Sequence, residues 1–190
     1  NYVKIEKLSW SEINKSFQGI PGANMKRPVA YLSFALNYYF HGFDVVGYHL
    51  VNILIHFANA VLLFMLLRRI LQLPIFGKTY EHNNFLISFL TVLFWAISPV
   101  HVSTVTYIVQ RMTGMAAMFF LMSMYFYLLA RTAGQRDRRI LFFVLCAVSA
   151  LAAILTKANA AMLPVILFLL DLILIKGATK ENVLSSLKIA

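Results

Sequence analysis

The feature that most constrains this chain is a run of 23 residues, 45–67, without lysine, arginine, aspartate or glutamate. About 20 consecutive apolar residues suffice for a helix to cross the hydrocarbon core of a bilayer. Shorter apolar runs follow at residues 85–97, 113–130, 140–155 and 160–175. The second run is short for a span unless it continues through Pro99. The sequence therefore predicts an all-α, polytopic membrane protein with about five transmembrane helices.

Composition supports this fold class and excludes a water-soluble globule. Of the 190 residues, 61% are hydrophobic and 13% are charged, whereas soluble domains carry about 25% charged residues. The formal net charge is +10. Because the basic residues flank runs of membrane-span length, we interpret them as topology signals and expect no nucleic-acid partner. The single cysteine, Cys146, excludes an intrachain disulfide.

The region before the first span is polar, with scattered aromatic residues. Ser9 followed by Glu12 matches a capping box and predicts a short helix. Residues 28–40 predict an aromatic-rich helix too short to span a bilayer, which we expect to lie in the membrane interface. The predicted organisation is an extracytoplasmic loop with interfacial helices (1–44), a transmembrane bundle (45–176) and a cytoplasmic linker (177–190).

The distribution of basic residues predicts the orientation. One side of the predicted bundle holds ten of them: Arg68, Arg69, Lys78, Arg131, Arg136, Arg138, Arg139, Lys176, Lys180 and Lys188. The other side holds seven: Lys4, Lys7, Lys15, Lys26, Arg27, Arg111 and Lys157. Because cytoplasmic loops carry the positive excess, we expect the first side to be cytoplasmic and the second to be extracytoplasmic.

Four polar residues share one face of the predicted helix 45–67. His49, Asn52, His56 and Asn59 are spaced by three, four and three residues, which places them within an arc of about 80°. Polar groups in membrane helices face protein or water, so this face is either a hydrogen-bonded packing seam or a cavity wall. No carboxylate or thiol joins them at helical spacing, so we expect no metal site there and consider a proton channel the weakest alternative.

The segment 98–111 is polar for a connection between two apolar helices, and it ends at Arg111. An arginine can bind a phosphate through its planar fork of donors, or it can extend to the lipid headgroups. Lys157, at the tip of the last predicted hairpin, admits the same two interpretations. With Lys26 and Arg27 these residues would form a cationic rim around a cleft. Such a cleft suits a lipid-linked phosphate whose apolar tail lies between helices.

Two carboxylates lie at or within the predicted spans. Asp44 precedes the first span, where a negative charge stabilises the positive end of a helix. Asp171 lies close to Lys176, and we expect a structural ion pair rather than a catalytic acid. Neither is a convincing general base.

Four stretches resemble, in order, the multispanning GT-C glycosyltransferases that often carry C-terminal tetratricopeptide repeats, a group related to the transmembrane O-mannosyltransferases. They are Lys26-Arg27-Pro28 through Leu36-Asn37-Tyr38, Gly47-Tyr48-His49-Leu50-Val51-Asn52 with His56, Val105-Thr106-Tyr107-Ile108-Val109-Gln110-Arg111, and Thr156-Lys157 through Leu163-Pro164. The resemblance implies transfer of a sugar from a polyprenyl-phosphate donor to a protein hydroxyl or another acceptor outside the cytoplasm. It also implies an acidic base or metal ligand ahead of Asn1, so we expect a piece of a longer enzyme that lacks the first transmembrane helix.

Our first hypothesis is therefore a membrane glycosyltransferase, with a polyprenyl-phosphate sugar as donor and a divalent cation left open as a cofactor. Arg111 and Lys157 would bind the donor phosphate. The cleft would be lined by His49, Asn52, His101, Tyr107 and Gln110. Membrane lipid, the lipid-linked sugar and a protein acceptor are the expected partners, and a bacterial cytoplasmic membrane is the expected location.

The chain departs from the family pattern in its acidic residues. Ser98-Pro99 and Ser103 stand where relatives often have His-Pro and a nearby Glu, and Lys157-Ala158 stands where they often have Lys-Glu. These departures keep a second hypothesis open, in which the chain is a noncatalytic membrane subunit that anchors or assembles a larger complex.

Overall fold

The computed structural model describes residues 4–5, 9–18 and 27–177, and every regular element within them is helical. Two short helices come first, α1 (Trp10–Gln18) and α2 (Pro28–His41). The following helices are α3 (Val45–Leu71), α4 (Asn84–Ala96), α5 (Val102–Thr106), α6 (Arg111–Thr132), α7 (Arg136–Thr156) and α8 (Leu163–Leu170), which continues as the π-helical turn Asp171–Lys176. Short 3-10 turns connect them at Pro74–Phe76, Pro99–His101, Ile108–Gln110 and Ala158–Met162. The all-α prediction is confirmed.

The expected number of spans is also confirmed. Four segments are long and apolar enough to cross a membrane: Val45–Leu71, Ile108–Thr132, Arg136–Thr156 and Ala158–Lys176. Helix α4 and the segment Pro99–Thr106 meet at a bend of 52° and make a fifth span if the pair is one crossing. Pro99 explains the break, since its ring replaces a backbone N–H donor and disfavours helical geometry at Ser98.

Local signals set the helix starts. The Oγ atom of Ser9 accepts a hydrogen bond from the N–H of Glu12 at 3.4 Å, as the capping box predicts. Asp44 caps α3, since its Oδ1 accepts from the N–H of Val46 at 3.0 Å. α3 extends beyond the expected end at residue 67 to Leu71. Arg68 and Arg69 lie in its last turn, where positive charge favours a helix.

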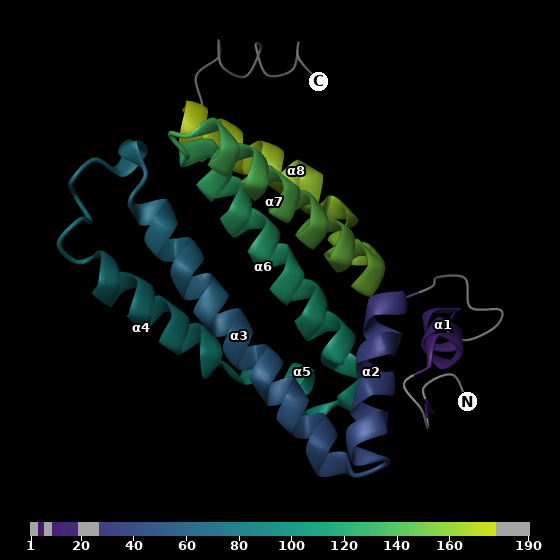
Figure 1. Ribbon diagram of the computed structural model, residues 1–190. Helices are drawn as coiled ribbons and strands as arrows, with labels where there is room; N and C mark the ends of the chain where they lie inside the picture. Colours follow the sequence, from purple (N-terminus) through teal and green to yellow (C-terminus); the bar gives the residue numbers. More distant parts are fainter. Residues whose placement is uncertain (1–3, 6–8, 19–26, 178–190) are drawn as a thin grey trace.

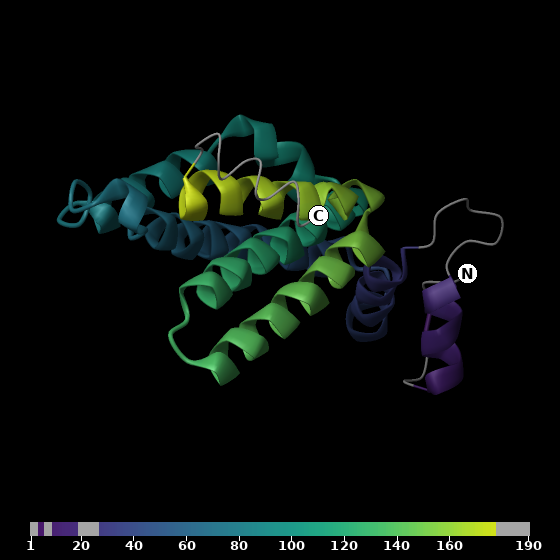
Figure 2. The same cartoon turned by 90° about the horizontal axis from the view of Figure 1, so that it is seen from above.

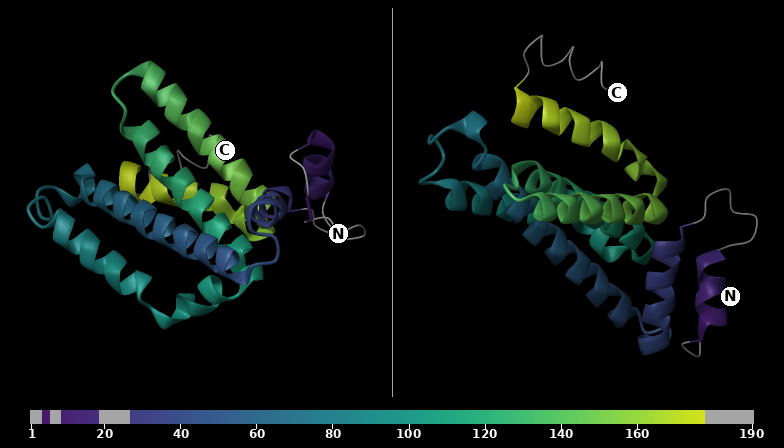
Figure 3. Two further views of the ribbon diagram at one scale, coloured as in Figure 1. Left: turned by 60° about the horizontal axis from the view of Figure 1, so that its bottom comes forward. Right: turned by 45° about the horizontal axis from the view of Figure 1, so that its top comes forward.

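The bundle is built around α3 and α6. In Figure 1, α3 lies between α4 and α6, and α2 lies beside the end where α3 and α6 begin. Figure 2 shows α6 and α7 as an antiparallel hairpin that points away from the plane of α3 and α4. The two views of Figure 3 show α8 running back from the end near α2 and diverging from α7. The beginnings of α3, α6 and α8 and the end of α7 therefore meet at one end of the molecule.

The apolar core consists of two buried clusters, one towards each end. Ala30, Phe34, Tyr48 and Met112 form the cluster at the α2 end. Leu66, Leu73, Leu128 and Leu170 form the other. Many other large apolar side chains are exposed, as expected for helices that face lipid. The helices therefore depend on polar contacts as well as on apolar packing to fix their positions.

Candidate functional site

Arg111 is the centre of a buried polar network. Its side chain is 1% exposed. Its Nε donates to Oδ1 of Asn52 at 2.9 Å, and its Nη2 donates to Oδ1 of Asn37 at 2.7 Å and to the carbonyl of Tyr48 at 3.0 Å. Nη1 donates to the carbonyl of Ser33 at 3.4 Å. One guanidinium therefore ties α6 to both α2 and α3.

Neutral groups stabilise the charge of Arg111 without cancelling it. The guanidinium carbon lies 4.7 Å from the ring centre of Phe34 and 5.3 Å from that of Tyr48, within range for cation–π attraction. Within the described residues no carboxylate forms a salt bridge with it. It lines a small cavity of about 10 Å³.

The structure thus places Arg111 inside the protein, and the expectation that it lies on an open cationic rim is wrong. The physical reason is that α2 and α3 offer it enough oxygen acceptors to replace water. Its assignment as a ligand of the donor phosphate stays a prediction. The neighbouring Arg27 donates from Nη1 to the sulfur of Met112 at 3.3 Å, and Lys26 lies outside the described residues.

The polar face of α3 is a packing seam, as one of the two sequence interpretations predicted. Asn52 donates from Nδ2 to the carbonyl of Val105 at 3.1 Å. Nε2 of His56 is 3.0 Å from the carbonyl oxygen of Ala96, and Asn59 donates to the carbonyl of Gly114 at 3.0 Å. Three of the four polar side chains therefore bind neighbouring helices or connections.

His49 and His101 have different surroundings. His49 is half-buried and makes no hydrogen bond to the described part of the chain. The ring of His101 lies 4.4 Å from that of Trp95 and 5.5 Å from that of His56, measured between ring centres. His101 thus belongs to an aromatic cluster at the bend between α4 and α5, and Trp95 also lines the neighbouring pocket.

Lys157 lines that pocket. Its Nζ donates to Oγ1 of Thr113 at 2.8 Å, and Thr113 donates in turn to Oε1 of Gln110 at 2.7 Å. Since Thr113 is two residues beyond Arg111, the two predicted phosphate ligands lie at the same end of the bundle. The chain of contacts leaves part of the ammonium and the amide N–H groups of Gln110 available as donors.

The pocket beside Lys157 is largely apolar. Its volume is about 390 Å³, within the range of about 300–1,000 Å³ typical of small-molecule sites. Lys157 is the only charged residue among those that line it, and Thr113 and Asn159 are its polar neighbours. The apolar lining residues are Leu63, Trp95, Ala116, Ala117, Phe120, Leu121 and Ala160. This arrangement can bind an apolar molecule that ends in an anionic group.

The structure does not bring the predicted cleft residues together. Gln110 reaches Lys157 through Thr113, whereas Asn52 holds Arg111 in the interior. Tyr107 is 66% exposed and does not line the pocket. Sequence reasoning missed Thr113, although its spacing of three residues from Gln110 on a helix predicts contact between the two side chains.

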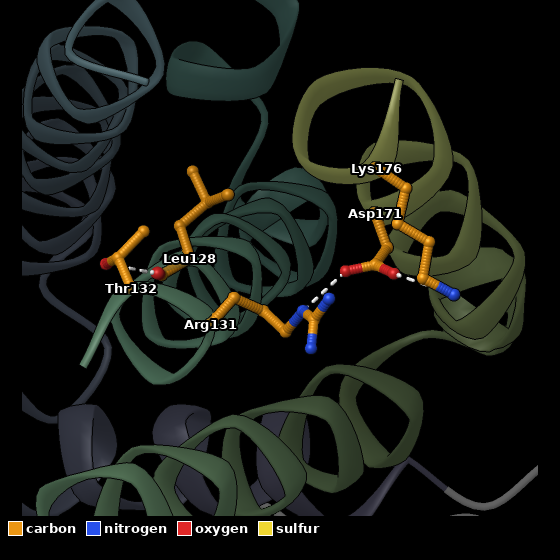
Figure 4. A network of polar contacts seen from close by, with 5 residues as sticks. All are labelled: Leu128, Arg131, Thr132, Asp171 and Lys176. Atoms are coloured by element: carbon orange, nitrogen blue, oxygen red, sulfur yellow. Dashed lines mark hydrogen bonds and ion pairs between the residues drawn. The ribbon is translucent and has the colours of Figure 1, made fainter. Parts of the chain in front are cut away.

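The carboxylates of the spans are already engaged. Asp171 accepts from Nε of Arg131 at 2.6 Å, and its other oxygen lies 3.7 Å from Nζ of Lys176 (Figure 4). The predicted ion pair with Lys176 is confirmed, with Arg131 as an additional partner. Asp44 caps α3. In the described part of the chain, no group of three His, Cys, Asp or Glu side chains could hold a metal ion.

Comparison with known proteins gives relatives over about half of the chain. No family model and no solved structure matches. The chain is 40% identical to Protein O-mannosyl-transferase TMTC4 of Homo sapiens over 51% of its own length and 14% of that protein. It is 36% identical to the Mus musculus TMTC4 over 62% of its length and 15% of that protein, and 35% identical to Protein O-mannosyl-transferase tmtc2 of Xenopus laevis over 54% and 11%. The chain thus spans a small part of these relatives, and the resemblance to the O-mannosyltransferase-like group is confirmed.

Proposed function

We propose that this chain is part of a GT-C membrane glycosyltransferase that moves a sugar from a polyprenyl phosphate to a protein hydroxyl. The observation that carries the proposal is the apolar pocket with Lys157 as its one charged lining residue. It occurs in a chain similar to proteins named protein O-mannosyl-transferases. Tetratricopeptide repeats elsewhere in the whole protein are part of the same resemblance and stay a prediction.

The pocket suits the two chemically different parts of such a donor. The apolar walls between α3, α6 and the connection after α7 would hold the first isoprenoid units. The phosphate would meet Nζ of Lys157, which Thr113 holds in place at 2.8 Å. The beginning of α6 adds positive potential at the same point, because the N-terminal end of a helix carries partial positive charge. Gln110 would add an amide donor.

Arg111 would act on this site indirectly, from the interior of the bundle. A phosphate could reach its guanidinium only by replacing acceptors on α2 and α3. We therefore assign to it the positioning of α2 against the beginning of α6, two residues before Thr113. Lys157, the other residue predicted to bind the donor phosphate, would contact the phosphate directly.

The reaction needs both a cation and a base. The acceptor oxygen attacks the anomeric carbon of the sugar, and the bond between that carbon and the phosphate oxygen breaks. Lys157 stabilises the negative charge that develops on the leaving phosphate. The proton of the acceptor hydroxyl goes to a base, which we assign to the acidic residue that the resemblance places ahead of Asn1. A divalent cation at that acidic residue belongs to the same proposal.

The pocket would open on the extracytoplasmic face, opposite the side with ten basic residues. This orientation rests on the positive-inside rule. The relatives named above are animal proteins, so they lend no support to a bacterial cytoplasmic membrane. We propose only the face of the membrane.

The substitution Lys157→Gln in the full-length protein tests the assignment. Loss of one charge-assisted contact to the phosphate should lower kcat/KM for a polyprenyl-phosphate sugar by about 10- to 100-fold. Lys157→Arg should restore most of the activity, and Lys78→Gln, which removes an exposed charge elsewhere, should have no effect. Wild-type transfer by a folded Lys157→Gln protein would remove Lys157 from the phosphate site.

A further inference from the structure

A second pocket lies between α3 and α6 towards the opposite end of the bundle. Its volume is about 310 Å³. Arg68 and Arg69 from the last turn of α3 line it together with Gln72, and Tyr125 and Leu129 line it from α6. No carboxylate is among its lining residues. Glu81 lines a separate pocket that shares only Gln72 with this one.

The two arginines retain unused hydrogen-bond donors. The Nε atoms of Arg68 and Arg69 are buried and have no hydrogen-bond partner among the described residues. The guanidinium of Arg68 lies 5.7 Å from the ring centre of Phe64 and 5.9 Å from that of Phe85. Arg69 uses Nη2 to bind Oγ1 of Thr132. Neither forms a salt bridge within the described parts of the chain.

We propose that this pocket binds the phosphate of an acidic phospholipid headgroup. Arg68 and Arg69 both line the pocket, and their Nε donors have no hydrogen-bond partner among the described residues, although buried polar groups are normally satisfied. An arginine fork matches phosphate oxygens, and two adjacent forks favour a headgroup with net negative charge. The position fits a lipid, because these arginines lie at the end of a membrane span, where lipid headgroups are found. Phe64 and Leu129 give the pocket an apolar wall that an acyl chain can contact.

The test uses the full-length protein, delipidated in an uncharged detergent and titrated with dioctanoyl phosphatidic acid. Dioctanoyl phosphatidylcholine and inorganic phosphate are the comparison probes, and the unfolding temperature is the readout. Phosphatidic acid should raise the unfolding temperature of the wild type more than either comparison probe at equal concentration. In the Arg68→Gln/Arg69→Gln double variant, the half-maximal shift should require about tenfold more lipid.

Two further variants distinguish binding in the pocket from attraction by the total positive charge. Arg136→Gln/Arg138→Gln removes two exposed charges from the first turn of α7 and should respond as the wild type does. Leu129→Trp fills the pocket, keeps both arginines and should abolish the shift. If the double arginine variant does not fold, Leu129→Trp still tests whether the lipid binds in this pocket.

Several results would overturn the proposal. An equal shift with phosphatidylcholine would exclude selection for acidic lipid, and an equal shift with inorganic phosphate would assign the site to free phosphate. Equal weakening in Arg136→Gln/Arg138→Gln would show that total charge, not the pocket, attracts the lipid. A wild-type response of Leu129→Trp would place the lipid elsewhere. None of these measurements depends on sugar transfer, so they are independent of the function proposed for Lys157.

Discussion

Two arginines at opposite ends of α6 show two ways of placing a positive charge in a membrane helix. Arg111 begins the helix, is 1% exposed and binds only neutral groups among the described residues. Arg131 lies in the last turn, has a side chain that is 33% exposed, and pairs with Asp171. The first position opposes the helix dipole and the second agrees with it. Arg111 must therefore be held by its amide and carbonyl partners, whereas Arg131 is favoured by its position and its partner.

The difference has an electrostatic consequence. Asp171 neutralises charge at the end that also carries Arg131 and Lys176 (Figure 4). At the other end, the charges of Arg111 and Lys157 have no carboxylate partner among the described residues. Uncompensated positive charge beside a low-dielectric bundle attracts anions. The end with the apolar pocket is therefore suited to an anionic substrate.

Replacing Arg111 with methionine should have the largest effect on stability. The change leaves Oδ1 of Asn52, Oδ1 of Asn37 and the carbonyl of Tyr48 without their donor in the interior. We expect the free energy of unfolding to fall by about 3–5 kcal/mol, since several buried acceptors lose their partner together. Chemical unfolding of the purified protein in detergent, followed by circular dichroism, measures the change.

Two controls define what this loss means. Arg111→Lys keeps the charge but cannot reach all the acceptors, so its loss should be intermediate. Arg138→Met removes an exposed arginine and should change the free energy of unfolding by less than about 0.5 kcal/mol. If Arg111→Met were as stable as Arg138→Met, the buried network would not be what holds α2 to the bundle.

Replacing Asp171 with asparagine should have a smaller effect. Arg131 is one-third exposed, so solvent already screens part of the ion pair. We expect a loss of about 1–2 kcal/mol in the free energy of unfolding, and a coupling of about 1 kcal/mol in a double-mutant cycle with Arg131→Gln. The coupling should shrink in high salt, because the Debye length falls to about 3 Å at 1 M. A coupling that salt does not change would contradict this account.

Sequence pattern predicted the elements that depend on the bilayer. Long apolar runs, the cap at Ser9 and the polar face of α3 each follow from local spacing, and each is found in the structure. The sequence left open what happens at Pro99, and the structure shows that α4 and the segment Pro99–Thr106 meet at a bend of 52°. Hydropathy identifies apolar segments but not the angle at which two of them meet.

The burial of Arg111 could not be predicted in the same way. A single arginine at the end of an apolar segment is compatible both with extension to the headgroups and with an inward position. The choice depends on Asn37 and Tyr48, which are far away in the sequence and come from α2 and α3. The contact between Gln110 and Thr113, by contrast, could have been predicted from the sequence, because the two residues lie within one helical turn.

The smallest effect should come from the part of the seam that does not touch Arg111. Asn59 makes one hydrogen bond, to the carbonyl of Gly114, and its Oδ1 has no partner among the described residues. Asn59→Leu therefore removes one contact and one unsatisfied oxygen, and we expect a loss of at most about 1 kcal/mol. Asn52→Leu removes an acceptor of Arg111 and should cost about 2–3 kcal/mol in the same chemical unfolding experiment. Equal losses of unfolding free energy in the two variants would contradict this account, because the hydrogen bond between Asn52 and Arg111 would then add no stability beyond that of the Asn59 contact.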